Sequence, residues 1–538
     1  MTTPTPTRGR SRRPWLAAAT ALATCQSGPP GRSAGPELAP PPQHESPWFA
    51  AGRSAAARAA RETPPARRAR SAILFVGDGM GVATATAARI REGQQRGEPG
   101  EENWLAFERF PYTALAKTYN TDAQVPDSAG TMTALVTGVK TRAGVLSVDE
   151  SVTPGDAAGV AGHELETLFE RAEARGLATG VVTTTRLTHA TPAACYAHSP
   201  ERDWEDDSQL PEAARAAGFP DLARQLVEFP GGDGLEVALG GGRAQFLPRG
   251  TPDPEHPGQT GARLDGRDLS AEWVARRPRA AFVWSRAQLE GLDLARTDHL
   301  LGLFEPSHLS FEADRARDPA GEPSLSEMTA AALAILSRHP RGFLLLVEGG
   351  RIDHAHHAGN AFRALGEAIE LSNAVRVALE KSDPGETLLL VTADHSHVLT
   401  LAGYPRRGND ILGLVMPNDE RGAPAPGPAR DALGLPYATL GYQNGPGYPG
   451  ASAEQPEGPK RYPHRPSAAR PAGGRPDLSG VETRDPGFLQ EAAVPLASET
   501  HGGEDVPVYA TGPGAELVRG VREQNYLYHV LARALGLD

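Results

Sequence analysis

Three apolar runs constrain the fold of this chain more than any other feature. Ala72–Val76, Phe343–Val347 and Leu388–Val391 show none of the polar alternation expected of a strand with one face in water. Continuous apolar runs of this length are typical of strands that are buried on both faces of a parallel sheet. The sequence therefore predicts an α/β fold with a large central, mostly parallel sheet.

Carboxylates and imidazoles follow these runs directly. Asp78 lies in a glycine-rich turn after the first run, and Glu348 ends the second. Asp394 and His395 follow the third run. Because ligands of open α/β sheets bind at the carboxyl ends of the strands, we expect these side chains to share one rim of one sheet. Taken alone, an acid such as Asp78 in a tight glycine turn is an ordinary turn residue.

The segment after Glu348 is the strongest local signal. Asp353 and His357 have the i, i+4 spacing that puts two side chains on one face of a helix, where they can hold one ion. Three histidines and two acids this close to an apolar strand favour metal binding over a structural role. Late in the chain, His501 adds an imidazole on a glycine-flanked loop.

Ser128 is a candidate nucleophile at the start of a predicted helix over residues 129–136. A helix N-terminus offers free backbone N–H groups and a positive dipole end, which suit an anion. The pair Asp127-Ser128 is also an ordinary N-cap, so it does not establish catalysis alone. Serine is a poor nucleophile unless a metal or a base activates it, which the metal-ligand motifs could do.

Polar residues after a further strand, over residues 176–185, extend the set. Thr191 can offer a hydroxyl to a hard cation, and His189 can act as a ligand or support one. Arg202 could clamp two phosphate oxygens or form a surface ion pair. Mixed nitrogen and oxygen ligands suit zinc, whereas Glu, Thr and Asp suit magnesium. The residues alone therefore predict a multi-metal hydrolase and leave open which ligand binds which ion.

The composition is that of a globular protein with long loops: of 538 residues, 39% are hydrophobic, 60 are glycine and 49 are proline. The formal net charge is −12, with basic residues concentrated near the N-terminus. This balance argues against nucleic acid as a partner. Because an acidic protein does not attract an anionic substrate, a phosphate site would need local positive charge, most simply from metal ions.

The N-terminus is predicted to be an export signal. A basic start, Arg8–Arg13, precedes an apolar run that is too short to span a membrane, and Ser11–Leu16 resembles a twin-arginine motif. Leu22–Cys25 resembles a lipoprotein cleavage site, which leaves open simple cleavage or lipidation of Cys25. We therefore expect a periplasmic, cell-surface or extracellular protein, either free or anchored as a lipoprotein.

Five motifs, in order along residues 71–535, together resemble the alkaline phosphatase family. They are Gly77-Asp-Gly-Met-Gly, Asp127-Ser-Ala, Val347-Glu-Gly-Gly-Arg-Ile-Asp-His, Thr392-Ala-Asp-His-Ser-His and Glu499-Thr-His-Gly-Gly-Glu-Asp. Three more are similar to the animal, tissue-type branch, namely His189-Ala-Thr-Pro, Arg202-Asp-Trp and Gly240-Gly-Gly-Arg. The resemblance implies a three-layer sandwich with helices on both faces of the sheet, and a loop-rich, crown-like insertion.

The resemblance also implies two Zn²⁺, one Mg²⁺ and, as in the animal branch, one Ca²⁺. One zinc would be held by Asp353, His357 and His501, and the second by Asp78, Asp394 and His395. Magnesium would be held by Asp78, Thr191 and Glu348, with His189 supporting its shell through water. Calcium would be held by Glu255, the carbonyl of Phe304, Glu305 and Glu322, where Glu322 replaces an Asp of the family.

By the same resemblance, the chain is a phosphomonoesterase of broad substrate range. Ser128, activated by the second zinc, would attack phosphorus and form a phosphoserine, while Arg202 clamps the phosphate. The substrates would be small phosphate monoesters, and the crown would contribute to a homodimer interface. Two alternatives stay open: a phosphodiesterase or sulfatase on the same scaffold, and a catalytically silent surface protein that binds metal or phosphate.

Composition and resemblance together predict the domain organisation. Residues 26–70 are rich in Pro, Gly, Ala and Arg with little periodic apolar pattern, which is typical of a disordered linker. The expected parts are an export signal over 1–25, this linker over 26–70, and a catalytic domain over 71–538 with the crown-like insertion at about 403–490.

Overall fold

The computed structural model describes residues 39–61 and 68–538. The predicted export signal and Cys25 lie outside the described residues. Within the described ranges, no helix has the length and apolarity that crossing a bilayer requires.

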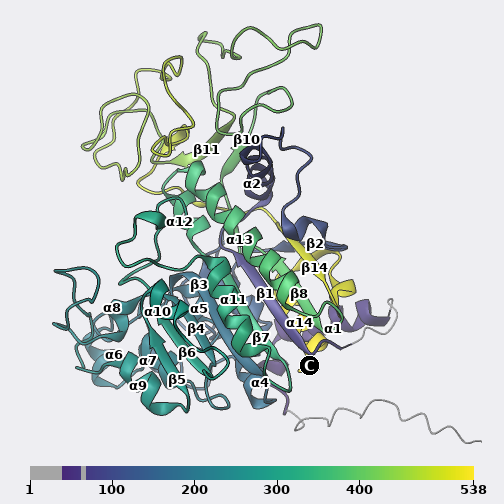
Figure 1. Cartoon of the computed structure of the whole chain (residues 1–538), viewed down its shortest axis with the longest axis vertical. Helices are drawn as coiled ribbons and strands as arrows, with labels where there is room; N and C mark the ends of the chain where they lie inside the picture. Colours follow the sequence, from purple (N-terminus) through teal and green to yellow (C-terminus); the bar gives the residue numbers. More distant parts are fainter. Residues whose placement is uncertain (1–38, 62–67) are drawn as a thin grey trace, which may run out of the picture. The chain divides into compact units, whose positions relative to one another are not determined.

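One ten-stranded sheet organises the catalytic domain (Figure 1). Seven neighbouring strands, β8, β1, β7, β3, β4, β6 and β5, pair in parallel along the sheet. Strand β14 pairs antiparallel with both β8 and β2. The predicted mostly parallel sheet is thus confirmed. From edge to edge the strands are β15 (Gly520–Glu523), β2 (Tyr112–Lys117), β14 (Val506–Thr511), β8 (Thr387–Thr392), β1 (Ser71–Gly77), β7 (Phe343–Gly349), β3 (Ala178–Arg186), β4 (Val237–Gly241), β6 (His299–Leu303) and β5 (Ala280–Val283).

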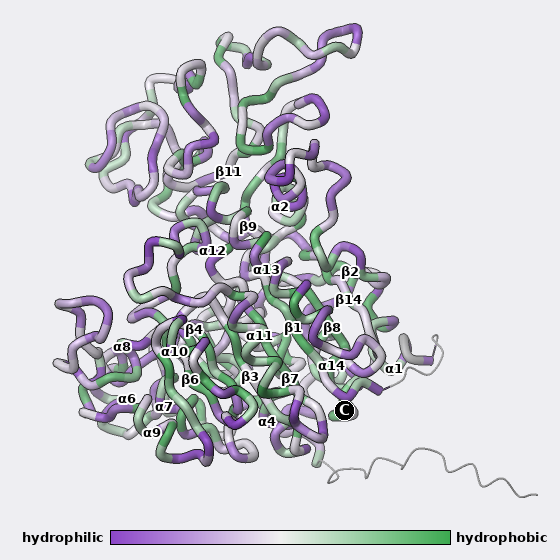
Figure 2. Tube along the Cα trace, in the orientation of Figure 1, coloured by the Kyte–Doolittle hydropathy of each residue, from purple (hydrophilic) through white to green (hydrophobic). Residues whose placement is uncertain are grey.

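The three apolar runs of the sequence form the central strands β8, β1 and β7. Every residue of these strands is buried, and Phe75 pairs with Val347 on one side and Val391 on the other. Figure 2 shows the corresponding hydrophobic stretch through the middle of the sheet. Full burial stabilises each such side chain by roughly 1.5–3 kcal/mol, so a charge at Leu345 would disrupt the sheet.

Helices cover both faces of the sheet. One helical layer packs against β1, β3 and β7 through α11 and α13, with α2 and α12 against α13. The other contacts the same strands through α4, α5 and α14, with α1 and α3 against α14. The first layer comprises α2 (Val82–Gln95), α11 (Leu325–Leu336), α12 (Arg351–His357) and α13 (Ala361–Lys381); the second comprises α1 (Pro47–Arg61), α3 (Ser128–Thr137), α4 (Leu168–Ala174), α5 (Ala190–Ala193) and α14 (Tyr526–Leu535).

Short elements complete the domain. Five further α-helices lie in the connections between β3 and α11, and five 3-10 helices are spread along the chain. They are α6 (Glu212–Ala216), α7 (Leu222–Val227), α8 (Arg243–Phe246), α9 (Leu269–Arg276), α10 (Arg286–Glu290), and η1 (Pro42–Glu45), η2 (Ala106–Arg109), η3 (Ala157–Gly159), η4 (Arg315–Arg317) and η5 (Ala515–Leu517).

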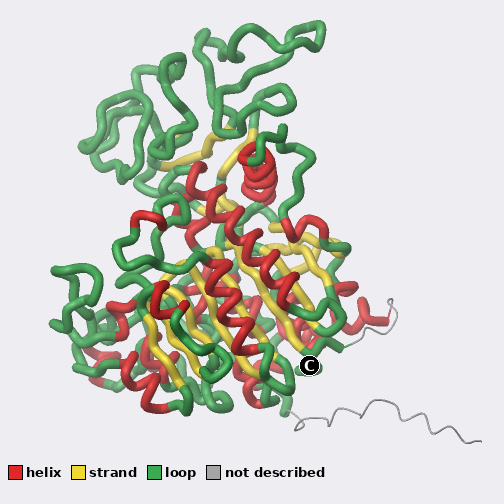
Figure 3. Tube along the Cα trace, viewed as in Figure 1, coloured by secondary structure: helices red, strands yellow, loops and turns green. Residues whose placement is uncertain are grey.

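The crown-like insertion stands on a small three-stranded sheet. In this sheet β11 (Leu440–Gly445) pairs antiparallel with β10 (Leu399–Leu401) and parallel with β12 (Ala492–Pro495). Between Gly403 and Gln490 the structure has no helix, and turns and loops make up most of the segment (Figure 3). The predicted loop-rich character of this region is confirmed.

The predicted linker is wrong for residues 42–61, which form η1 and α1. The buried face of α1 carries Phe49, Gly52 and Ala56, and it packs on α14. The Phe49 ring lies 4.7 Å from the His529 ring, and a side chain at Gly52 would collide with that imidazole. Two of these three residues are small, so the helical periodicity of the face carries little hydrophobic signal in the sequence.

The strand ends bring the predicted acids to one rim. Val76 of β1 lies level with Glu348 of β7 and with Thr392 of β8, because the three strands pair in register. Asp78 therefore emerges beside Glu348 and Asp394. This arrangement confirms the expectation that these side chains meet at the carboxyl ends of the parallel strands.

Candidate active site

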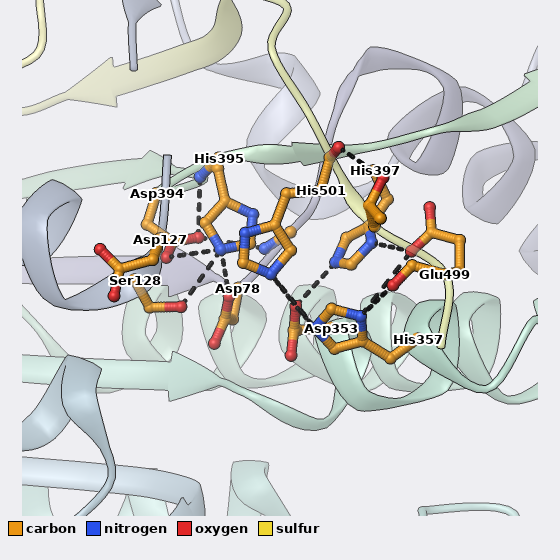
Figure 4. Close-up of polar contacts among 12 residues, drawn as sticks. Asp78, Asp127, Ser128, Asp353, His357, Asp394, His395, His397, Glu499 and His501 are labelled. Carbon is orange, nitrogen blue, oxygen red and sulfur yellow. Dashed lines mark hydrogen bonds and ion pairs between the residues drawn. The ribbon is translucent and has the colours of Figure 1, made fainter. Parts of the chain in front are cut away.

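Ser128 is the first residue of α3, and Asp127 caps the helix. The Asp127 carboxylate accepts hydrogen bonds from the backbone N–H groups of Gly130 at 3.1 Å and Gly144 at 3.0 Å. The Ser128 side chain is buried, and its Oγ lies 3.1 Å from Nε2 of His395 (Figure 4). The Asp-Ser pair is thus an N-cap and also part of a buried polar cluster.

His395 faces two carboxylates. Its Nε2 lies 3.3 Å from Oδ1 of Asp78 and 3.3 Å from Oδ2 of Asp394, and all three side chains are buried. Its Nδ1 lies 3.3 Å from the carbonyl oxygen of Ser396. Because a carbonyl can only accept, this contact puts the proton of the neutral ring on Nδ1. The lone pair of Nε2 then points toward the carboxylates and Ser128.

His357 and His501 form a second group with Asp353. The Nε2 atoms of the two rings lie 3.1 Å apart, and each lies 3.3 Å from Oδ1 of Asp353. On the other side of each ring, Nδ1 of His357 donates to the carbonyl of Glu499 at 2.6 Å, and Nδ1 of His501 donates to that of Pro126 at 2.7 Å. Both neutral rings therefore turn an unprotonated Nε2 toward the same carboxylate oxygen.

The donor sets of both groups fit metal ions. Asp78, Asp394 and His395 each offer one ligand atom within 4.8 Å of the others. In the second group, the facing ligand atoms of Asp353, His357 and His501 lie 3.1 to 3.3 Å apart. Lone pairs that converge repel one another unless a cation lies between them. A backbone carbonyl on the second ring nitrogen is also the usual support of a zinc-bound histidine.

Glu348 belongs to a third group, with Asp78 and His189. One of its carboxylate oxygens accepts a hydrogen bond from Thr183, whereas Oε1 is buried and has no hydrogen-bond partner. Burial raises the pKa of Glu348 to about 7, although the Thr183 and Thr191 hydroxyls oppose this shift. Thr191 therefore lies beside Glu348, and these oxygen ligands are the kind that magnesium prefers.

The charge of this region favours a bound cation. Burial, together with the neighbouring charges of Asp394, Asp353 and Glu348, raises the pKa of Asp78 well above its usual range. Both carboxylate oxygens of Asp78 are buried and lack a hydrogen-bond partner. Buried carboxylates of this kind are stable only when they are protonated or when divalent ions supply positive charge.

Arg202 is held beside the serine by two contacts. Its Nη1 donates to Oδ2 of Asp127 at 3.0 Å, and its Nη2 donates to Nε2 of His189 at 3.2 Å. Burial works against its charge, but Asp127 and Asp78 outweigh burial and raise the pKa of Arg202. A guanidinium oriented in this way beside Ser128 can donate two hydrogen bonds to an anion.

Two residues absent from the predicted ligand set complete the cluster. His397 donates to Oδ1 of Asp353 at 2.7 Å and to Oε2 of Glu499 at 2.5 Å. Burial opposes a charge on this ring, but Glu499 and Asp353 outweigh it and raise the pKa of His397 to about 10. His397 also lies opposite His501 in the antiparallel pair of β9 (Ser396–His397) and β13 (His501–Gly502). The second His of the Asp-His-Ser-His motif was the sequence signal for this residue.

An outer acidic group contains two of the predicted calcium ligands. Glu255 and Glu305 each offer a carboxylate oxygen within 4.8 Å of ligand atoms from His256 and Asp318. Phe304 directly precedes Glu305 at the end of β6 and is buried. Burial and the charges of neighbouring acids raise the pKa of Glu305 to about 9, and a bound cation would relieve the repulsion among these carboxylates.

Glu322, the fourth predicted calcium ligand, lies close enough to Glu305 for its charge to raise the pKa of that carboxyl. Both of its carboxylate oxygens accept a hydrogen bond from the backbone N–H of Ser310, at 3.0 and 3.1 Å. Asp318 also lies with Glu255 and Glu305. The sequence did not reveal Asp318, because the loop conformation that turns it inward leaves no periodic pattern.

Comparisons with known proteins identify the family of this chain. The alkaline phosphatase family model matches residues 69–537. This chain belongs to the alkaline phosphatase family. It is 47% identical over 473 residues to the tissue-nonspecific alkaline phosphatase of Gallus gallus, a match that covers 87% of this chain and 84% of the relative. It is 43% identical over 505 residues to the alkaline phosphatase of Gadus morhua, covering 93% and 98%.

Solved structures of alkaline phosphatases share the fold. The enzyme of Thermus thermophilus superimposes with a TM-score of 0.61 at 28% identity, covering 88% of this chain and 92% of the other. The enzyme of the Antarctic bacterium TAB5 has a TM-score of 0.55 at 20% identity, covering 88% and 99%. Family membership and the similarity to named enzymes make this alkaline phosphatase a metal-dependent hydrolase of phosphate monoesters. The family predicted from the motifs is confirmed.

Proposed function

We propose that Ser128 is the nucleophile and that hydrolysis proceeds through a phosphoserine. The observation that carries this proposal is the position of Ser128 Oγ, 3.1 Å from Nε2 of His395 beside the carboxylates of Asp78 and Asp394. The hydroxyl thus lies next to the group that fits a metal ion. Incubation with ³²P-labelled substrate, followed by acid quenching and peptide mapping, tests whether Ser128 carries the label.

Two zinc ions and one magnesium ion fit the three inner groups. Asp353, His357 and His501 would hold one zinc, and Asp78, Asp394 and His395 the other. Asp78, Thr191 and Glu348 would hold magnesium, with His189 nearby to order a water. When bound, these ions would supply the positive charge that activates a hydroxyl or water and stabilises a departing oxygen. Elemental analysis of the purified protein tests the metal content.

The protein itself would position the phosphate. Arg202 is kept in place by Asp127 and His189, so it loses little conformational freedom when it donates to phosphate oxygens. The positive dipole end of α3 lies at Ser128, the first residue of the helix. Both devices favour an anion directly in front of Ser128 Oγ, which is the geometry required for attack on phosphorus.

We propose a calcium site at Glu255, Glu305 and the carbonyl of Phe304. Asp318 is the better fourth ligand, because Glu322 already accepts two hydrogen bonds from Ser310. Titration of calcium into Asp318→Asn and Glu322→Gln by calorimetry distinguishes the two. Weaker binding is expected in the Asp318 variant.

The similarity to named alkaline phosphatases favours monoesters over the alternative substrates. Relative rates on 4-nitrophenyl phosphate, bis(4-nitrophenyl) phosphate and 4-nitrophenyl sulfate test this preference. The monoester should react fastest by orders of magnitude. A faster diester or sulfate reaction would replace the proposed specificity with that of a phosphodiesterase or sulfatase.

Export, anchoring and assembly complete the proposal. The twin-arginine-like N-terminus supports export, followed by either cleavage or lipidation at Cys25. Mass spectrometry of the mature N-terminus distinguishes the two outcomes. We also propose a homodimer that uses the crown-like insertion, and light scattering of the purified enzyme tests its mass.

A further inference from the structure

A cavity of about 330 Å³ lies beside His357, between α12 and the crown-like insertion. Its lining includes basic residues from several segments and not a single Asp or Glu. This is unusual in a chain whose net charge is −12. None of the roles given above to the metal ligands, Ser128 or Arg202 uses this cavity.

One wall of the cavity is formed by two histidines. The rings of His308 and His354 lie 4.2 Å apart. Arg351 donates to Nδ1 of His354 at 3.0 Å, and because arginine can only donate, the proton of this ring lies on Nε2. No described residue accepts a hydrogen bond from that Nε2–H. This wall therefore offers a hydrogen-bond donor that lacks an acceptor.

Arg351 adds positive charge to the same wall. Its guanidinium stacks 3.8 Å over the Phe311 ring, and its Nε is buried without a hydrogen-bond partner. Among the described residues, no carboxylate forms an ion pair with it. A buried guanidinium with an unpaired N–H group is costly in free energy unless an anion can reach it.

The opposite wall comes from the crown-like insertion. Tyr462 and Arg465 line the cavity there, and Arg465 is exposed. Among the described residues, Arg465 has neither an ion-pair partner nor a hydrogen-bond partner for its side chain. Two arginines from different parts of the chain thus meet at one cavity, and neither forms an ion pair with a described carboxylate.

The position of the cavity indicates which part of a substrate it receives. His357 and Ser498 also line it, and His357 belongs to the group in which we place one zinc ion. This group lies farther from Ser128 than His395 does in Figure 4, so it corresponds to the side from which a leaving group departs during attack by Ser128. The leaving group of a bound monoester would point toward Arg351 and Arg465.

We propose that this cavity is a subsite for a second phosphate group on the leaving group, so that the enzyme prefers bisphosphorylated substrates. The inference rests on the proposed hydrolysis at Ser128. Arg351 and Arg465 would neutralise the second phosphate, and the free N–H of His354 would donate a hydrogen bond to it. A substrate with a neutral leaving group would not contact these donors, which would stay hydrated, so they would not increase its affinity.

Two matched substrates test the subsite, namely propane-1,3-diol monophosphate and propane-1,3-diol bisphosphate. They release the same type of alkoxide and differ only in the second phosphate. We expect kcat/KM to be higher for the bisphosphate after correction for its two equivalent groups. In Arg465→Glu this preference should fall by about fivefold or more, while kcat/KM for the monophosphate is retained.

Arg470→Glu is the matched control, because Arg470 is exposed on the same segment of the insertion and does not line the cavity. The preference should persist in this variant, which separates a local contact from a general loss of positive charge. His354→Phe removes the free N–H of the other wall and should also lower the preference. An equal preference in the wild type and in the Arg465 and His354 variants would overturn the subsite. If the wild type hydrolyses neither substrate, the proposed function itself is refuted.

Discussion

His357 and His501 turn their Nε2 atoms toward each other across 3.1 Å, while each donates its Nδ1 proton to a backbone carbonyl. Two lone pairs at this distance repel each other. Asp353 adds a carboxylate oxygen 3.3 Å from both. The backbone has therefore fixed the tautomers of both rings in the form that binds a metal, and the protein is preorganised for the ion before the ion arrives.

Removal of metal should inactivate and destabilise the enzyme. An ion bound at a thousand times its Kd stabilises the folded state by about 4 kcal/mol, so chelation should lower Tm markedly. Zinc, with magnesium, should restore both activity and Tm. Calorimetry measures Tm, activity assays measure turnover, and elemental analysis establishes the metal content of each sample. Full activity in protein shown to be metal-free would contradict the assignment.

His501→Ala should reduce zinc content and leave Asp353 and His357 without their third partner. Loss of one ligand should weaken zinc binding by at least about 10-fold. His163→Ala is a suitable control, because this exposed histidine contacts Asp149 and Ser151 instead. Zinc retention by His501→Ala equal to that of the wild type would count against the site.

Ser128→Ala should lower kcat by at least about 10³-fold and abolish the phosphoenzyme. The fold should persist, because alanine fits the start of α3 and Asp127 still caps the helix. Acid-quenched protein after incubation with labelled substrate reports the intermediate, and Ser151→Ala, at an exposed serine, is the control. Label retained on the Ser128 variant would refute the nucleophile.

Arg202→Ala should weaken phosphate binding more than it slows catalysis. A charge-assisted hydrogen bond contributes about 1.5–3 kcal/mol, which corresponds to roughly a 10- to 100-fold rise in KM and in the inhibition constant of inorganic phosphate. Arg202→Lys should recover only part of the affinity, because an ammonium group cannot bridge two oxygens as a guanidinium does. Unchanged phosphate inhibition in both variants would exclude Arg202 from the phosphate site.

Glu499→Gln should destabilise the fold without removing any proposed zinc ligand. The carboxylate accepts hydrogen bonds from His397 and from the backbone N–H of Val398. Removal of one partner of a buried ion pair costs about 3–5 kcal/mol. Glu504→Gln, at an exposed carboxylate that accepts from Ser396, should change stability by less than about 0.5 kcal/mol. Denaturant unfolding compares the two, and equal stability would show that the pair with His397 contributes nothing.

The packing of α1 on α14 should make the enzyme sensitive to acid. Burial, with a smaller contribution from Arg53, lowers the pKa of His529 to about 3. In the unfolded chain this imidazole binds a proton below about pH 6.5, so stability should fall as pH decreases from 6.5 toward 3, by about 1.4 kcal/mol per pH unit. Between pH 7 and pH 5 the wild type should lose about 2 kcal/mol more than His529→Phe. Parallel losses in both proteins would show that His529 is not buried in its neutral form.

The sequence predicted the sheet and the acids at its rim because burial imposes a strong pattern. Apolar runs place β1, β7 and β8 in the centre of the sheet, and Asp78, Glu348 and Asp394 then follow from the strand ends. Outside the central sheet, the functional residues do not follow apolar runs, so the sequence gives no such pattern. Asp318 lies on an irregular loop, and the cavity-lining Arg465 comes from an insertion without periodic structure. α1 was missed because Gly52 and Ala56 give its buried face little hydrophobicity.

β14 joins β2 to the rest of the sheet, since β2 pairs only with β14 and with the neighbouring edge strand β15. The segment that leads from β2 to Ser128 therefore has no central strand to dock on until Val506–Thr511 has been synthesised. A nascent chain still on the ribosome would therefore lack the strand that links β2 to the central strands. Premature termination before β14 should thus leave β2 and β15 unpaired with the central strands, so the complete sheet can form only after almost the whole chain has been synthesised.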